Sequence, residues 1–237
     1  MGKFKGISPE GIFLLAENRF NDSKIFYEEN KPRIKELVIN PLYDLINDLQ
    51  PVLYALDSEM ELTPYKMVSR VRRDNRYTND KSMYRENLWV MFMRDKRRFN
   101  YRQPCMWFEF KPDHYNYGIG IFYCDAKMMD AFRKTLDENG EEFLKALRKI
   151  KKIGIEPNLE SYKKDRSEGK DKRLKDYYNA KELYFMSPDK PLEKLFDGSV
   201  EEELLTAIKA FSPMYKFLLK VTEKVLDNNI QGEKDNG

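Results

Sequence analysis

The stretch LWVMFM, residues 88–93, is apolar at every position, which is typical of a β-strand covered on both faces. Two further strand patterns follow it. Residues 105–111 and residues 117–123 both alternate between apolar side chains and other residues, as a strand with two different faces requires. Lys111-Pro112-Asp113 lies between them and favours a tight turn. Consecutive strands with short connections predict an antiparallel meander.

Helical patterns lie on both sides of this strand block. Residues 32–56 repeat apolar side chains at helical spacing, with a kink or break expected at Pro41. Residues 199–226 do the same, starting from a capping-box sequence. We therefore predict an α+β fold, an antiparallel β-sheet (meander) flanked by helices from both the N- and C-terminal segments. Residues 1–226 are expected to form one domain, and residues 227–237 a flexible C-terminal tail.

Four local predictions complete the fold. Residues 65–72 favour a strand that leads into a charged run. Asp125 is expected to cap a helix that ends near Asn139-Gly140, with the helical pattern resuming from Glu141 to Ile150. Residues 151–176 are charged and poor in apolar side chains, so we expect a long surface loop. Leu183 to Met186 is a short apolar run, which indicates an edge strand.

The charge of the chain is unevenly distributed. The 237 residues carry a formal net charge of only +3, with 41% hydrophobic and 35% charged residues. Residues 66–102 alone hold twelve lysines and arginines against four acidic residues. A sizeable core is therefore expected, together with one positive segment that would attract anions. The low total charge argues against a dedicated nucleic-acid-binding protein.

The cysteines and the N-terminal sequence favour a cytoplasmic protein. Cys105 and Cys124 are isolated, without the spacing of a metal site or a disulfide framework. The start of the chain lacks the apolar stretch of a signal peptide, and no window of about 18 apolar residues predicts a membrane span. We expect no contact with a membrane, and the sequence leaves the oligomeric state open.

The central charged run, residues 70–84, is the strongest candidate for a functional site. It holds five cationic side chains, two aspartates and two tyrosines. Arginine guanidinium groups offer forked donors that suit phosphate or carboxylate. On an extended backbone Arg72 and Asp74 would share one face, and Val71 and Arg73 the other. Two interpretations stay open: a pocket for an anion, and an Arg–Asp–Tyr network that ties a loop to the sheet.

The neighbouring strands offer a second part of this site. Trp107 and Glu109 are expected on the same sheet face as Gly118 and Gly120, where bare backbone would let a flat group approach. The alternative is that an aromatic ring packs over the glycines. The candidate ligand-binding residues are Arg70, Arg73, Asp74, Arg76, Lys81, Tyr84, Trp107 and Glu109.

The sequence indicates no catalytic machinery. His114 is the single histidine, and no cluster of histidines and cysteines suits a metal. No phosphate-binding glycine loop or nucleophile elbow is present. We expect a site without metal or cofactor, and the catalytic residues, if the protein is an enzyme, are unknown. Residues 94–102 mix basic and aromatic side chains as in nucleic-acid contacts, but also as in an exposed hairpin tip.

The central run closely resembles the signature of a bacterial family, the domain of unknown function 2461. The matching pattern is Arg70-x-x-Arg73-Asp74-x-Arg76-Tyr77-x-x-Asp80-Lys81-x-x-Tyr84. The resemblance also covers residues 26–31, the strand at 118–120 and the helix around Pro213. This chain departs from the family pattern at a few positions. The family favours Trp, Phe, Pro, Lys and His, respectively, at the positions that hold Ile25, Tyr77, Met83, Arg85 and Glu109 here.

The resemblance implies a fold and a motif but no activity. From the residues we predict that the chain binds a small phosphate- or carboxylate-bearing ligand through Arg70–Tyr84, in a reaction that is unknown. The alternative is a non-enzymatic interaction protein whose basic segment contacts an acidic protein partner or nucleic acid. We also predict that Asp74 is buried and paired with an arginine of the motif.

Overall fold

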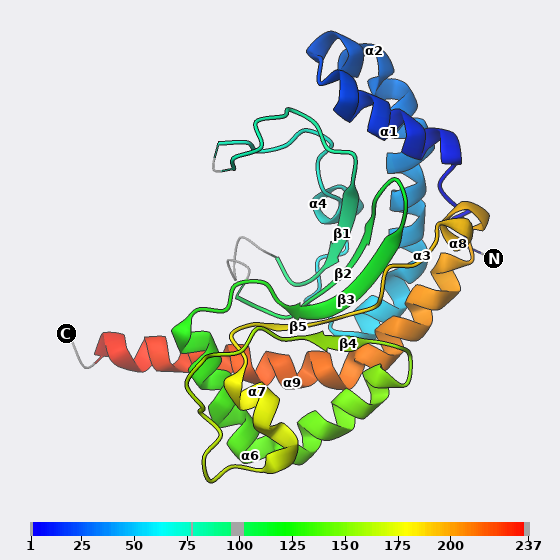
Figure 1. The fold of residues 1–237 in the computed structure, drawn as a ribbon. Coiled ribbons are helices and arrows are strands. Elements are labelled where there is room, and N and C mark those ends of the chain that lie inside the picture. The colour runs from blue at the N-terminus through cyan, green and yellow to red at the C-terminus, as the bar shows by residue number, and fades with distance from the viewer. Residues whose placement is uncertain (1, 77, 96–101, 235–237) are drawn as a thin grey trace. The chain divides into compact units, whose positions relative to one another are not determined.

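A five-stranded antiparallel sheet with helices from both ends of the chain makes up the fold (Figure 1). The computed structural model describes residues 2–76, 78–95 and 102–234, with side chains up to residue 226. The order of the strands in the sheet is β1-β2-β3-β5-β4. Their bounds are Leu88–Phe92 for β1, Cys105–Phe110 for β2, Tyr115–Ile121 for β3, Glu156–Asn158 for β4 and Leu183–Met186 for β5. The α+β prediction is confirmed.

The chain forms two compact units. Unit 1 contains Met1–Phe92, Trp107–Tyr117 and Asp189–Thr206, and unit 2 contains Met93–Met106, Gly118–Pro188 and Ala207–Gly237. The prediction of a single domain over residues 1–226 stays a prediction.

The N-terminal helices belong to unit 1. They are α1 (Pro9–Asn21), α2 (Lys24–Ile34), the π-helical turn η1 (Lys35–Ile39) and α3 (Asn40–Leu56). Ser8 and Ser23 cap α1 and α2 by accepting backbone N–H groups with their hydroxyls. The disturbance expected at Pro41 is the π turn, in which the Asn40 amide donates to the Lys35 carbonyl. Proline has no amide to continue the regular pattern and crowds the preceding turn, so a widened turn accommodates it.

Residues 65–72 differ from the predicted strand. Pro64–Met67 form a short helix, α4, because proline suits the first turn of a helix and the Lys66 amide donates to the Thr63 carbonyl. The extended backbone begins only at Val68, which bridges to Val90 in β1. The strand prediction is therefore wrong for the first part of the segment.

The helix α6 (Ala126–Lys151) of unit 2 has the predicted break in its middle. Asp125 caps its N-terminus as expected and accepts the Met128 amide. The break at Asn139-Gly140 is a kink, with a φ of −131° at Asn139, and the helix resumes after it as predicted. Gly140 avoids a clash, because a Cβ at this position would lie 2.8 Å from the Leu174 side chain. The amphipathic face of α6 continues past the kink, and its burial outweighs the local stop signal.

The remaining elements lie in the second half of the chain: η2 (Lys172–Leu174), α7 (Lys175–Asn179), α8 (Glu193–Asp197) and α9 (Val200–Lys234). The helix predicted after Ser199 begins at Val200 and passes through Pro213 without ending. None of the described helices is long and apolar enough to cross a membrane.

Strand β5 was expected at a sheet edge but lies inside the sheet. Tyr184 in β5 is opposite Gly120 of β3 on one side and opposite Asn158 of β4 on the other. The edge is formed by β4, inside the segment predicted as a loop. Its three residues are too few and too polar to produce a strand pattern.

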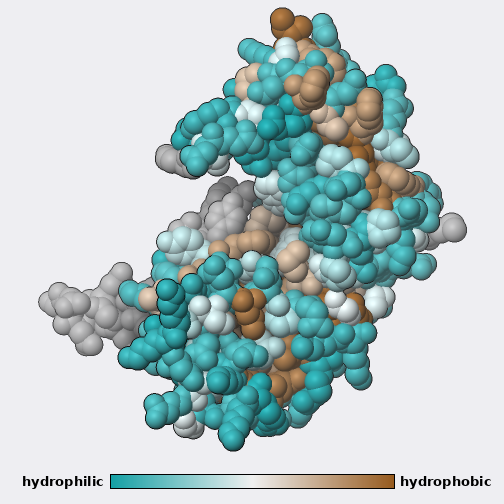
Figure 2. Space-filling model, in the orientation of Figure 1, coloured by the Kyte–Doolittle hydropathy of each residue, from teal (hydrophilic) through white to brown (hydrophobic). Residues whose placement is uncertain are grey.

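Each unit has its own apolar core. In unit 1, α3 buries a stripe of leucines and isoleucine, and Phe108 of β2 packs against Tyr115 of β3. In unit 2, the rings of Phe132, Phe143 and Phe217 contact one another with centroids 5.1–6.2 Å apart. Figure 2 shows a mostly hydrophilic face with a few apolar side chains exposed.

Candidate functional site

The central run of arginines is held in a short two-stranded ladder, which we call the motif ladder (residues 71–73 and 83–85). The Arg73 amide donates to the Met83 carbonyl at 2.8 Å, and the Arg85 amide donates to the Val71 carbonyl at 2.9 Å. Arg72 and Tyr84 bridge between these two bonds. Because side chains alternate along extended chains, Arg73 and Arg85 project from one face and Arg72 and Tyr84 from the other.

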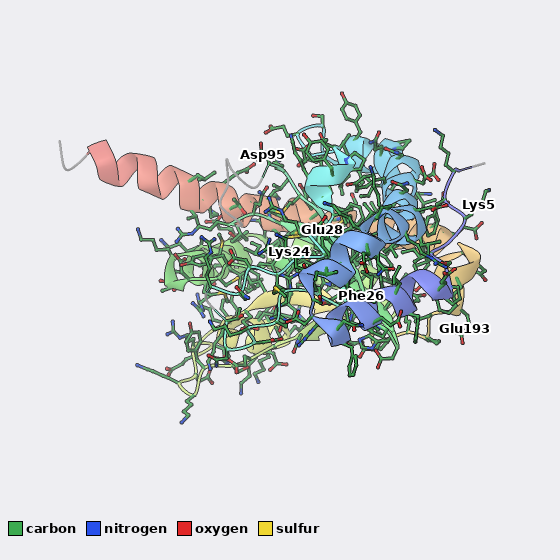
Figure 3. The ribbon with its side chains drawn as sticks, turned by 90° about the horizontal axis from the view of Figure 1, so that it is seen from above. Lys5, Lys24, Phe26, Glu28, Asp95 and Glu193 are labelled. Atoms are coloured by element: carbon green, nitrogen blue, oxygen red, sulfur yellow. The ribbon has the colours of Figure 1, made fainter. Side chains whose placement is uncertain are left out.

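The face with Tyr84 is structural. Tyr84 is 2% exposed, and its ring stacks on Tyr27 of α2 with centroids 4.7 Å apart. Phe26 and Glu28, labelled in Figure 3, flank Tyr27 on this helix. Asp22, the C-cap of α1, accepts the amides of Met83 and Tyr84 at 2.7 and 3.2 Å. These contacts bind the ladder to the α1–α2 turn.

The opposite face carries Arg73, which is only partly satisfied. Its Nη1 donates to Asp80 at 2.6 Å, and Arg19 of α1 approaches the same carboxylate at 3.3 Å. The Asp80 carboxylate also accepts the Ser82 amide. The Arg73 side chain is 20% exposed, yet its Nε is buried and has no hydrogen-bond acceptor. One edge of the guanidinium group therefore remains available.

Arg85 has no anion at all among the described residues. Its guanidinium group lies over the ring of Trp89, 4.6 Å from the ring centroid, and its buried Nε has no acceptor. Burial lowers the pKa of Arg85, the nearby charge of Arg73 lowers it further, and Glu109 opposes both effects. A half-buried cation without a paired carboxylate is unfavourable for folding alone.

Glu109 and Asn87 extend this face along the sheet. The Asn87 Nδ2 donates to the Glu109 Oε1 at 2.6 Å, joining the start of β1 to β2. Trp107 lies two residues before Glu109, on the same face of β2, and is 9% exposed. Arginines, two tryptophans and a carboxylate thus gather on one side of unit 1.

Asp74 and Arg76 lie outside this group. Arg76 Nε and Nη2 donate to the two oxygens of Asp74 at 2.9 and 2.7 Å. The predicted pairing of Asp74 with a motif arginine is confirmed. The prediction that Asp74 is buried is wrong, because its side chain is 55% exposed and that of Arg76 is 72% exposed. Hydrogen bonds from the Arg76 side chain and amide lower the pKa of Asp74 to about 2.

The remaining residues of the predicted site do not belong to this group either. Arg70 is exposed and, by alternation along the chain, projects away from Arg73. Lys81 is exposed and its Nζ donates to the Asn75 carbonyl, which closes the loop at the end of the ladder. Tyr77 lies outside the described residues. Arg73 and Glu109 thus both act on Arg85, and Trp107 shares the β2 face of Glu109, whereas Arg70, Asp74, Arg76 and Lys81 are exposed.

Sequence reasoning missed Arg85, Asn87 and Trp89. Alternation could not have found them, because the chain bends at Glu86 before β1 begins; the contacts of Arg85 with Trp89 and of Asn87 with Glu109 place them on this face. Arg85 was noted only as a departure from the family pattern.

Gly120 of β3 lies directly against the backbone of the neighbouring strand β5. A Cβ on Gly120 would lie 2.5 Å from the Cβ of Tyr184 and 2.3 Å from the Leu183 carbonyl oxygen. Glycine at this position allows the close approach of β5 and leaves no open space for a ligand.

The other side chains that could take part in chemistry either pair with neighbouring residues or lie apart from one another. His114 contacts Asp113 at 2.7 Å in the β2–β3 turn. Within the described part of the chain, no three metal-ligating side chains cluster. A surface hollow of about 750 Å³ at the α6 kink is lined by charges that pair with each other, Lys170 with Asp137 and Arg173 with Glu141. Residues 96–101, the centre of the predicted basic-aromatic loop, lie outside the described residues.

The comparison with protein families matches this architecture. A family model described as a conserved hypothetical protein (DUF2461) matches residues 12–217. The chain belongs to this family. The match includes the motif ladder, all five strands of the sheet and the first half of α9. A search of curated proteins gave no match.

Proposed function

We propose that this member of the DUF2461 family binds a small phosphate- or carboxylate-bearing ligand between Arg73 and Arg85. One observation carries the proposal. Two neighbouring guanidinium groups each keep a buried Nε without an acceptor, and Arg85 has no paired carboxylate among the described residues. Buried donors are nearly always satisfied in folded proteins, so an absent acceptor is expected to occupy this position.

The local chemistry suits an oxyanion. Two guanidinium groups offer planar, forked donors that match the oxygens of phosphate or carboxylate. Trp89 covers one face of the Arg85 group and fixes its plane. The motif ladder fixes both backbones, so little ordering is required on binding. The proposed function is binding, with the residues of any reaction left unassigned.

Anion titrations of the intact chain test the proposal. Phosphate, acetate and chloride are compared at matched ionic strength by thermal unfolding, since a ligand that binds only the folded state raises its stability, by about 2.7 kcal/mol at a hundred times Kd. We expect phosphate or acetate to raise the melting temperature more than chloride. This excess should disappear in Arg85→Met and Arg73→Met.

The matched control is Arg70→Met, which removes the same charge from an exposed position on the opposite face. It should keep the full anion response. Arg85→Lys keeps the charge but loses the fork, and should respond in an intermediate way. Phosphate, like sulfate, also stabilises proteins generally by exclusion from their surface, so the decisive quantity is the anion response of each variant relative to the wild type. If Arg85→Met keeps the excess, or if Arg70→Met loses it equally, the proposed site is wrong.

A second candidate is an interaction protein that contacts an acidic protein partner. Arg70, Arg72 and Arg76 favour it, because all three are exposed and could meet carboxylates on another surface. Under this alternative Arg70→Met weakens binding of an acidic polypeptide such as polyglutamate, and Arg85→Met does not. The proposed function predicts the reverse order for a small anion.

A further inference from the structure

A row of polar side chains crosses the sheet beside the two arginines. The Lys111 amide donates to the His114 carbonyl at 2.8 Å, which closes a two-residue turn between β2 and β3. This register places Glu109 directly opposite Asn116, with their side chains on the same face. Asn87 contacts Glu109 from the other side. We call Asn87, Glu109 and Asn116 the polar row.

The polar row has acceptors that lack donors. Asn116 is 4% exposed, and its Nδ2 donates to Asp189 at 3.0 Å. Its Oδ1 is buried and has no hydrogen-bond partner within the described chain. Glu109 accepts one hydrogen bond, from Asn87, and pairs with no lysine or arginine that the structure describes. An unpaired buried acceptor is unfavourable, so a donor is expected to meet it.

The unpaired acceptors and the unpaired donors face the same side. Arg85 stacks on Trp89 of β1, and Asn87, between them in the sequence, contacts Glu109 of β2, so these side chains lie on a common face. Glu109 acts electrostatically on Arg85, but the two side chains form no ion pair. The Glu109 carboxylate therefore lies near Arg85 without being neutralised by it.

We infer that the ligand is a small zwitterion, with its oxyanion on Arg73 and Arg85 and a protonated amine on Glu109 and Asn116. This inference rests on the proposed function and adds the second half of the ligand. An inorganic anion would satisfy the arginines and leave the polar row without a donor. Asn87, only two residues after Arg85, contacts Glu109 directly, so we expect the anion and the amine to be separated by only a few bonds.

A pair of probes that differ only in the amine tests this inference. Ethylphosphonate and 2-aminoethylphosphonate are titrated into the intact protein by calorimetry. A charge-assisted hydrogen bond should make the amine-bearing probe about tenfold or more tighter in the wild type. Glu109→Gln should abolish this preference. It should also strengthen ethylphosphonate binding, because a negative charge near the anion is removed.

The control is Glu86→Gln, which removes one negative charge from an exposed residue of the same segment. It should keep the preference for the amine. If the wild type binds both probes equally while Arg85→Met loses both, the anion site stands and the zwitterion inference is overturned. If Glu86→Gln removes the preference as fully as Glu109→Gln, the effect is one of general charge and the inference is also overturned. If neither probe binds, the proposed function fails first.

Discussion

Glu203 provides the sharpest test of how unit 1 is held together. This α9 carboxylate accepts the hydroxyls of Tyr115 and Tyr117 at 3.0 and 2.8 Å. Lys190 and Lys194 approach its oxygens at 3.0 and 2.8 Å. Its side chain is only 13% exposed. One acid thus joins the helix to β3 and to the segment after β5.

The contribution of Glu203 to the folding free energy follows from its pKa. Burial alone would raise it, but hydrogen bonds from Lys194, Lys190 and Tyr117 lower it from 4.5 to about 2. That difference corresponds to about 3 kcal/mol of folding free energy. Because the pKa is lower in the folded protein, the contribution is complete above about pH 5. It is lost as the pH falls from about 4.5 toward about 2.

Urea denaturation of Glu203→Gln measures this contribution. Tryptophan fluorescence reports on unit 1, because both tryptophans of the chain, Trp89 and Trp107, belong to it. The variant should lose about 3 kcal/mol of unfolding free energy at about pH 7, and the difference from wild type should vanish on acidification.

The control for this experiment is Glu202→Gln, the exposed neighbour on the same helix, which should change little. Comparing two variants at each pH cancels the titration of all other carboxylates. A difference that stays constant from about pH 7 down to about pH 3 would refute the linkage argument. So would an equal loss in Glu202→Gln.

Three further predictions concern contacts described above. Asp74→Ala should leave the urea midpoint unchanged, because Asp74 is exposed and its partner Arg76 is more exposed still. Asp22→Ala should lower the unfolding free energy by about 1–3 kcal/mol, because it leaves two backbone amides without an acceptor. Asp22→Asn keeps an acceptor and should recover most of that loss, so equal losses in the two Asp22 variants would contradict the assignment. Gly120→Ala should cost about 1–3 kcal/mol, since the added methyl group would lie 2.3 Å from the Leu183 carbonyl oxygen. Circular dichroism during thermal unfolding measures it, and an unchanged melting temperature would show that β5 can move aside.

The sheet was predictable where side-chain periodicity and turn residues agree. The strand at 105–111 has both signals, the strand at 88–93 is an unbroken apolar run, and the Asp125 cap has a direct physical cause. Residues 156–158 and 183–186 were harder, because a strand of three or four residues has too short a pattern to reveal its neighbours. Their place in the sheet depends on pairing between distant segments, which local sequence does not encode.

The types of residue in the candidate site could be predicted from the sequence, but only some of the individual residues could be identified. Alternation correctly separated Arg73 from Arg72. It could not show that the chain leaves its extended path after Arg73, which places Asp74 at the surface with Arg76. Arg85 was missed because the face on which it lies can be identified only from its pairing with residues 71–73 in the motif ladder. Such cross-strand neighbours become visible only once the register of the ladder is known.

Asp22 gives the motif ladder an unusual dependence on the first helix pair. It is the described non-glycine residue with a positive φ, at 44°, and from that position it ends α1 while holding the amides of Met83 and Tyr84. Those two amides can exchange with solvent only when the α1–α2 turn opens. The turn and the ladder should therefore open together, as one cooperative unit in hydrogen exchange. Occupancy of the arginine face would then slow amide exchange in α1 and α2, in helices that the ligand does not touch.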